Sequence, residues 1–119
     1  MHNFKELSVR KKARWLTKNI YNVTKKFPDN EKYAIISQIQ RACVSIASNI
    51  AEWAWRWSDK EFMHFLNIAY WSAFELETQI ILSYDLWYLN STEMEIITES
   101  INEIQKMIYW LIQHNKQKK

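Results

Sequence analysis

Apolar residues recur along the chain at the three- and four-residue spacing of an amphipathic helix, in four separate segments. In the first segment Val9, Ala13 and Leu16 share one helix face, and Pro28 ends the segment because proline cannot continue a helix. The same spacing returns three more times before the end of the chain. The pattern therefore predicts four helices, which run over residues 8–26, 29–54, 58–88 and 92–115.

Two of these helices begin with a capping sequence, in which a hydroxyl residue precedes a glutamate by three positions. Ser58 and Glu61 form the first pair, and Thr92 and Glu95 form the second. The connections between the helices are short, which favours antiparallel neighbours. We therefore expect an all-α protein, an up-down-up-down antiparallel four-helix bundle that occupies residues 1–119 as one domain.

The composition supports a helical fold and excludes several classes of site. The 119 residues contain no glycine, where average usage would give about eight, and seven tryptophans. Tight hairpins and phosphate-binding loops need glycine, so the sequence as written excludes both. The single cysteine fits a reducing compartment. No signal-peptide core and no apolar run of membrane-spanning length is present, so we expect a cytoplasmic protein without a membrane partner.

The positive charge is concentrated at the N-terminus, where residues 1–28 contain eight basic residues and one acidic residue. Four of them, Lys11, Arg14, Lys18 and Lys25, share the helix face opposite the apolar stripe, and Arg10, Lys12 and Lys26 broaden the row. Such a row can follow the phosphates of RNA or DNA and release their counterions. An ordinary solvated face and attraction to the acidic residues 58–90 of a second subunit are the alternatives. The predicted nucleic-acid contacts are Arg10, Lys11, Arg14, Lys18, Lys25 and Lys26.

A polar stripe lies opposite the apolar stripe on residues 29–54, and a matching stripe lies on residues 58–88. We expect a polar network between helices or subunits, in which Arg41 pairs with Glu52 or Glu75. Two solvated faces are the alternative interpretation. The predicted members of the network are Gln38, Arg41, Ser45, Asn49, Glu52, Glu75 and Gln79.

Residues that could carry catalysis or bind a metal are few. Glu61 and His64 have the spacing found in di-iron bundles, but those sites need a second such pair, which the sequence lacks. Cys43 falls on an apolar stripe, which predicts a buried and inert thiol. We therefore expect no catalytic residues, no metal and no cofactor.

The middle of the chain also carries the signature of a known family. Its residues are Phe27-Pro28, Glu31-Lys32-Tyr33, Gln38, Arg41-Ala42, Ser45-Ile46, Asn49-Ile50-Ala51-Glu52, Ser58-Asp59-Lys60-Glu61-Phe62, Phe65-Leu66, Ala69, Ser72 and Glu75-Leu76-Glu77-Thr78-Gln79. In these residues the chain resembles the four-helix-bundle proteins encoded in intervening sequences of bacterial 23S rRNA genes, over about residues 5–113.

The resemblance implies a ring-like homo-oligomer (a pentamer), a basic surface suspected of binding RNA or DNA, and no known enzymatic activity. The accessory protein of diversity-generating retroelements shares that fold and resembles the chain much more weakly. It would imply instead a protein-interaction subunit that partners a reverse transcriptase.

The resemblance also implies glycine at five positions where this chain has tryptophan: Trp53, Trp55, Trp71, Trp87 and Trp110. Trp87 falls where the third helix should end, which is a natural place for a left-handed glycine. Trp71 lies beside Ser72 in mid-helix, where glycine would permit a close helix contact. One hypothesis is that the gene uses UGA for glycine while the sequence was written with UGA as tryptophan. If the protein carries tryptophan, we expect these indoles on the surface or at subunit contacts.

Overall fold

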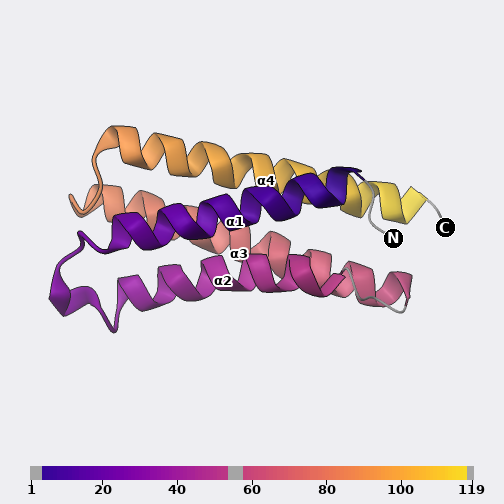
Figure 1. Cartoon of the computed structure of the whole chain (residues 1–119), viewed down its shortest axis with the longest axis horizontal. Helices are drawn as coiled ribbons and strands as arrows, with labels where there is room; N and C mark the ends of the chain where they lie inside the picture. Colours follow the sequence, from indigo (N-terminus) through magenta and orange to yellow (C-terminus); the bar gives the residue numbers. More distant parts are fainter. Residues whose placement is uncertain (1–3, 54–57, 118–119) are drawn as a thin grey trace.

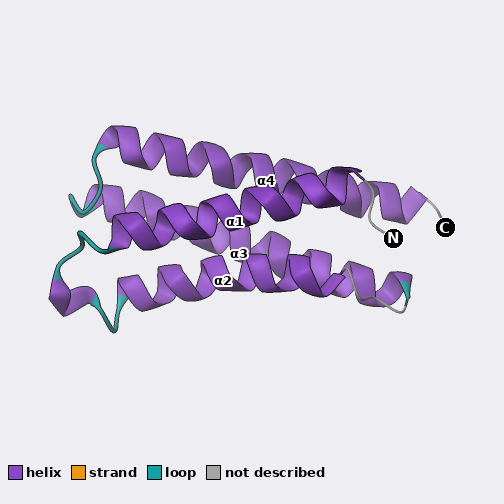
Figure 2. Cartoon of the chain, viewed as in Figure 1, coloured by secondary structure: helices purple, strands orange, loops and turns teal. Residues whose placement is uncertain are grey.

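The computed structural model describes residues 4–53 and 58–117, which form four long helices (Figure 1). A 3-10 turn, η1, lies between the first two helices. The elements are α1 (Phe4–Thr24), η1 (Asp29–Glu31), α2 (Ile35–Glu52), α3 (Asp59–Asp85) and α4 (Ser91–Gln117). Figure 2 shows helices joined by short loops, and the described residues contain no strand. The bundle is elongated and measures 47 × 24 × 19 Å.

Each helix packs against its neighbours in the chain, and α4 completes the ring by packing on α1. Within the described residues the diagonal pairs, α1 with α3 and α2 with α4, make no close backbone approach. Successive helices run in opposite directions (Figure 1). The predicted up-down-up-down antiparallel four-helix bundle is therefore confirmed.

The apolar stripes of the four helices meet along the axis of the bundle and form one core. Its largest fully buried side chains include Leu16, Ile20, Ile39, Ile46, Leu66, Leu76, Ile80, Ile97, Ile101 and Ile104. Small residues of α3, Ala69 and Ala73, are also fully buried and leave room for the neighbouring helices. No helix in the described part of the chain is long and apolar enough to cross a membrane.

The second helix begins later than the periodicity predicts. Residues 29–31 form η1, in which backbone hydrogen bonds join residues three apart, such as Lys32 N–H to Asp29 C=O at 3.1 Å. Ala34 then departs from helical geometry with φ −115° and ψ −108°, so α2 starts only at Ile35. The sequence Asp29-Asn30 after Pro28 explains the difference, because aspartate and asparagine favour turns over a helix interior.

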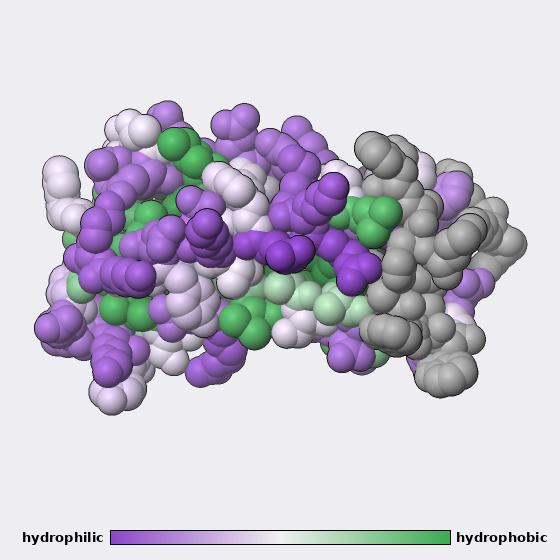
Figure 3. Space-filling view, in the orientation of Figure 1, coloured by the Kyte–Doolittle hydropathy of each residue, from purple (hydrophilic) through white to green (hydrophobic). Residues whose placement is uncertain are grey.

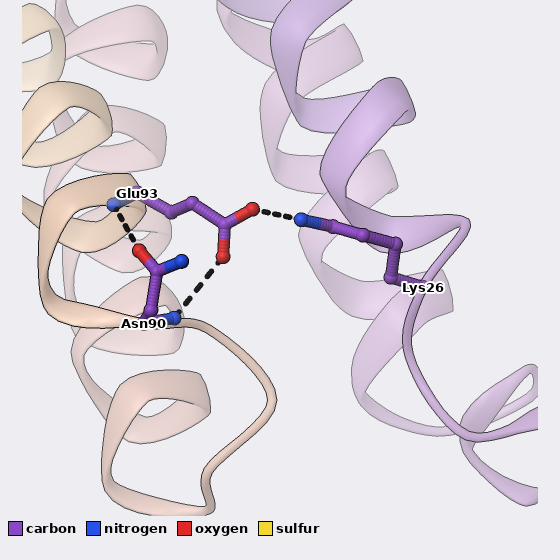
Figure 4. Close-up of polar contacts among 3 residues, drawn as sticks. All are labelled: Lys26, Asn90 and Glu93. Atoms are coloured by element: carbon purple, nitrogen blue, oxygen red, sulfur yellow. Dashed lines mark hydrogen bonds and ion pairs between the residues drawn. The ribbon is translucent and has the colours of Figure 1, made fainter.

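The helix caps agree with the sequence for α3 and differ for α4. Ser58 Oγ accepts a hydrogen bond from the backbone N–H of Glu61 at 3.2 Å, which confirms the predicted cap of α3. At α4 the cap is Asn90 in place of Thr92. Asn90 Oδ1 accepts from the Glu93 N–H at 2.7 Å, and the Glu93 carboxylate accepts from the Asn90 N–H at 3.1 Å (Figure 4). Asparagine caps a helix as well as a hydroxyl residue does, so the reciprocal box starts two residues earlier.

Helix α3 ends in a Schellman motif whose left-handed residue is a tryptophan. The Tyr88 N–H donates to the Ser83 C=O at 2.9 Å, and the Trp87 N–H donates to the Tyr84 C=O at 3.0 Å. Trp87 has φ 68°, the single positive φ among the described residues. Glycine usually occupies this position because it has no Cβ. The predicted left-handed site at the end of the third helix is thus confirmed, and its indole is 93% exposed.

The other tryptophans at expected glycine positions divide into two groups. Trp71 and Trp110 are 69% and 40% exposed, which confirms the surface expectation for both. Trp53 is fully buried, and its ring meets Phe62 edge-on at 5.7 Å between centroids, so the surface expectation is wrong there. The reason is that Trp53 continues the apolar stripe of α2 into the core. Trp55 lies outside the described residues.

Candidate nucleic-acid interface

The outward face of α1 presents most of the predicted cations to solvent. Lys11, Arg14 and Lys18 are exposed on α1, Lys25 is exposed in the turn that follows it, and Arg10 is half-buried. None of these five forms an ion pair within residues 4–53 and 58–117. Figure 3 shows hydrophilic side chains gathered along the face that α1 crosses. At 1.5 Å per residue, Lys11 to Lys18 spans about 10 Å of helix, and Lys25 extends the row beyond the end of α1, so the row can meet several phosphates.

Lys26, the sixth predicted contact, is already engaged by α4. Its Nζ pairs with the carboxylate of Glu93, the same carboxylate that caps α4 (Figure 4). Lys12 forms a similar pair with Glu103 farther along α4. All four side chains are partly exposed, so each pair contributes at most about 1 kcal/mol. The two pairs fix the side of α1 that faces α4 and leave the remaining cations pointing outward.

Acidic residues of α4 bound the basic face on one side. Glu95 and Glu99 are exposed, and Glu93 and Glu103 are the partly buried partners of the lysines just described. A polyanion would be repelled from this edge and attracted to the ridge of α1. The electrostatics therefore confine the candidate surface to the outward face of α1.

An exposed indole lies among these cations, and the sequence did not single it out. Trp15 is 46% exposed. It lines two shallow hollows. The first, of about 350 Å³, is lined by Lys11, Arg14, Trp15 and Lys18. The second, of about 490 Å³, opens between α1 and α4 and is lined by Lys11, Lys12, Trp15, Ile96, Glu99, Ser100 and Glu103. The available signal was a large aromatic residue outside the apolar stripe of α1 and flanked by basic residues.

The structure brings together part of the predicted polar stripe between α2 and α3. The hydroxyls of Ser45 and Ser72 share a hydrogen bond of 2.8 Å across the two helices. The side-chain amide of Asn49 donates to the Ser45 carbonyl at 2.8 Å and to its hydroxyl at 3.3 Å. The close contact beside position 71 is therefore made by Ser72, while the Trp71 indole points into solvent.

The charged members of that stripe remain apart. Gln38, Arg41, Glu52 and Glu75 are exposed, and Arg41 pairs with neither glutamate within the described part of the chain. The pairing expected inside one chain is absent because exposed ions gain little from it in water. Gln79 is buried instead of exposed, and its Oε1 has no hydrogen-bond partner among the described residues. Pairing of these residues across subunits stays a prediction.

A different polar cluster joins α3 to α4, and sequence reasoning missed it. The Glu77 carboxylate accepts hydrogen bonds from the Asn102 amide at 2.8 Å and from the Gln105 amide at 3.0 Å. Asn102 also donates to the Gln105 side-chain oxygen at 3.0 Å. The available signal was a pair of amide residues three positions apart on one face of α4. The predicted polar stripes lay on residues 29–88 and did not include this helix.

The lone thiol is buried in the core, as its place on the apolar stripe predicts. Cys43 is fully buried, and its Sγ donates to Thr17 Oγ at 3.4 Å. Burial raises the pKa of the Cys43 thiol to about 11, although the hydrogen bond with Thr17 acts in the opposite direction. The thiol is therefore neutral and a poor nucleophile near pH 7. Among the described residues, no group of three or more histidine, cysteine, aspartate or glutamate side chains is arranged to hold a metal ion.

These features define a class of protein, an antiparallel four-helix bundle with a cationic ridge on its first helix. Residues 5–110 match the family of the 23S rRNA-intervening sequence protein, and the chain belongs to that family. A similar solved structure is the 1.70 Å crystal structure of a protein of unknown function from the S23 ribosomal protein family of Bacteroides thetaiotaomicron VPI-5482. It is 29% identical, with a TM-score of 0.86, over 92% of this chain and 99% of that one. No curated protein matches the chain.

Proposed function

We propose that the protein is a non-enzymatic homo-oligomer that binds RNA or DNA through the outward face of α1. The observation that carries this proposal is the exposed row of Lys11, Arg14, Lys18 and Lys25. These side chains have no carboxylate partner within the described residues, so phosphates can pair with them without displacing an internal contact. The name of the family refers to 23S rRNA, which makes RNA the first ligand to test.

Apolar side chains left exposed on the single chain support the homo-oligomer. They lie on α3 and α4 and include Phe74, Ile81, Leu82 and Tyr109. Contiguous exposed apolar surface marks interaction sites in soluble proteins. A pentamer is the assembly that the resemblance implies, and Arg41 would then find Glu52 or Glu75 on a neighbouring subunit. Light scattering of the purified protein tests this part, and a monomer at every concentration would contradict it.

The nucleic-acid part is tested by fluorescence anisotropy with a labelled fragment of 23S rRNA at several salt concentrations. Four phosphate contacts predict that log K falls with log [salt] at a slope of about −3 to −4. The decisive variant carries Lys11→Glu, Arg14→Glu and Lys18→Glu together. Its matched control carries Lys32→Glu, Lys60→Glu and Lys106→Glu, three exposed lysines on other parts of the bundle.

Both triple variants change the net charge by the same amount, so they separate a localised surface from a general charge effect. We expect the α1 variant to lose binding and to flatten the salt dependence, while the control keeps most of its affinity and its slope. Equal losses in the two variants, or binding that does not respond to salt, would contradict a phosphate-binding surface on α1.

A further inference from the structure

Trp15 is a large exposed aromatic residue among the cations of α1. Its neighbours one turn before and after, Lys11 and Lys18, carry full charges, and the adjacent Arg14 carries a third. Even so, this large indole leaves nearly half of its surface in water rather than packing into the core. Residues three and four apart lie about 5–6 Å from one another on a helix surface, measured between Cβ atoms, so Lys11 and Lys18 are near the ring. Arg14 lines the same hollow as Trp15.

We infer that Trp15 is a stacking platform for an unpaired nucleobase, so that the nucleic acid bound by α1 is single-stranded at this point. The inference rests on the proposed function, because the flanking cations would hold the phosphates of the same strand. A cationic groove with an interposed aromatic ring is the combination that single-strand binding proteins use. The hollow lined by Lys11, Arg14, Trp15 and Lys18 places both parts on one helix.

A duplex would not use the indole in this way. In double-stranded RNA or DNA the faces of the bases are covered by their stacked neighbours, and only edges and phosphates reach a flat helix surface. Contact of α1 with a duplex would thus involve the cations alone. An unpaired base can turn its face toward Trp15 while its phosphate stays beside Lys11 or Lys18. The geometry therefore favours single strands, loops and bulges.

The chain offers a matched control in Trp71, which is also exposed but has a different setting. Its surroundings are lined by His64, Asn67, Ile68, Ser72 and Glu75, with no lysine or arginine among them. An indole without cations beside it cannot bring a phosphate and a base together. Substitution of Trp71 should therefore leave nucleic-acid binding unchanged, even though the same type of side chain is removed from the surface.

The test compares a 12-nucleotide oligouridine with a 12-base-pair RNA duplex by anisotropy. We expect the wild-type protein to bind the single strand more tightly. Trp15→Leu should weaken single-strand binding by about 5- to 150-fold, the range measured for loss of one base stack, and change duplex binding less than about two-fold. Trp15→Tyr should restore most of the single-strand affinity because it restores an aromatic face. The salt slope of Trp15→Leu should equal that of the wild type, because no phosphate contact is lost.

The possible outcomes distinguish the stacking role of Trp15 from the proposed binding of nucleic acid by α1. If Trp15→Leu binds the single strand as well as the wild type, or weakens single strand and duplex equally, the stacking role is wrong while nucleic-acid binding stands. If Trp71→Leu weakens binding as much as Trp15→Leu, the effect is not specific to the cationic face. If the wild type binds neither ligand, both the proposed function and the inference fail. Circular dichroism of each variant shows that the bundle is intact, and Trp15→Tyr provides a second reading if Trp15→Leu unfolds.

Discussion

Replacing Trp87 with glycine should stabilise the protein, which is unusual for the removal of a large aromatic side chain. Trp87 holds φ at 68° in the Schellman motif at the end of α3. A left-handed conformation costs an L-residue about 1–2 kcal/mol because Cβ crowds the backbone, and glycine avoids this. The greater freedom of glycine in the unfolded chain offsets about 0.5–1 kcal/mol. Since the indole is 93% exposed, its removal sacrifices almost no buried surface.

The expected net gain for Trp87→Gly is therefore about 0.5–1 kcal/mol, which raises the midpoint of thermal unfolding by roughly 2–6 °C in a domain of this size. The assay is thermal or urea unfolding followed by circular dichroism. Trp87→Ala is the control, because alanine keeps Cβ and loses the indole. Alanine should change the stability by less than about 0.5 kcal/mol. A gain with alanine equal to that with glycine, or no gain with glycine, would refute the argument from backbone strain.

Three further predictions concern the interior. Trp53→Ala should destabilise the bundle by about 3–5 kcal/mol in urea unfolding, because it leaves a cavity beside Phe62. Glu77→Ala should cost about 1–3 kcal/mol in the same assay, because it leaves two amides of α4 without their acceptor. For Cys43, the pKa of about 11 lies above the ordinary 9.0, so its contribution to stability is complete below pH 9 and is lost as the pH rises toward 11. The difference in unfolding free energy between wild type and Cys43→Ala measures this loss.

Contrary results would be informative in each case. A small effect at position 53 would mean that the end of α2 repacks around the cavity. A double substitution that removes Glu77 and Asn102 should cost less than the sum of the single changes, and strict additivity would argue against a shared cluster. A difference between wild type and Cys43→Ala that stays constant from pH 8 to 11 would contradict the raised pKa, since the two proteins differ only at this position.

The sequence predicts the bundle well because its information about helices is local. Apolar stripes at three- and four-residue spacing place Leu16, Ile46 and Ile101 in the core without any knowledge of their partners. The cap at Ser58 is equally local, since its donor lies three residues away. The left-handed position at Trp87 came from the family resemblance, which implies glycine there, whereas the periodicity carries the third helix on to residue 88 and the structure ends it at Asp85.

Features that depend on contacts between distant segments could not be predicted from the sequence. Glu93 has one partner three residues away and another on α1, and only the folded chain brings Lys26 to it. In the cluster around Glu77, Asn102 and Gln105 lie far from Glu77 in the sequence, at separations of 25 and 28 positions. Trp15 was missed for a different reason, because it breaks the apolar stripe and single deviations from a stripe are common. The two hollows that Trp15 lines depend on how the side chains of α1 and α4 pack, which the sequence alone does not show.

The hypothesis that glycine is encoded by UGA can be tested separately from stability. The intact mass of the protein purified from its native host distinguishes tryptophan from glycine at the five positions. A mass that fits tryptophan at all five would contradict recoding. The left-handed backbone at Trp87 is the position where the structure most clearly favours glycine.

The seam between the first and last helices is the least extensive of the four helix contacts. Its two edge contacts, Lys12 with Glu103 and Lys26 with Glu93, use ammonium groups that a polyanion on α1 would also attract. In the proposed complex, phosphates would compete with these glutamates for the same lysines. A strand that captured both lysines would release the two carboxylates along α4 and weaken the seam. If α1 binds a nucleic acid as proposed, its occupancy would be linked to the closure of the bundle, and hydrogen exchange along α4 is the observable in which that linkage would appear.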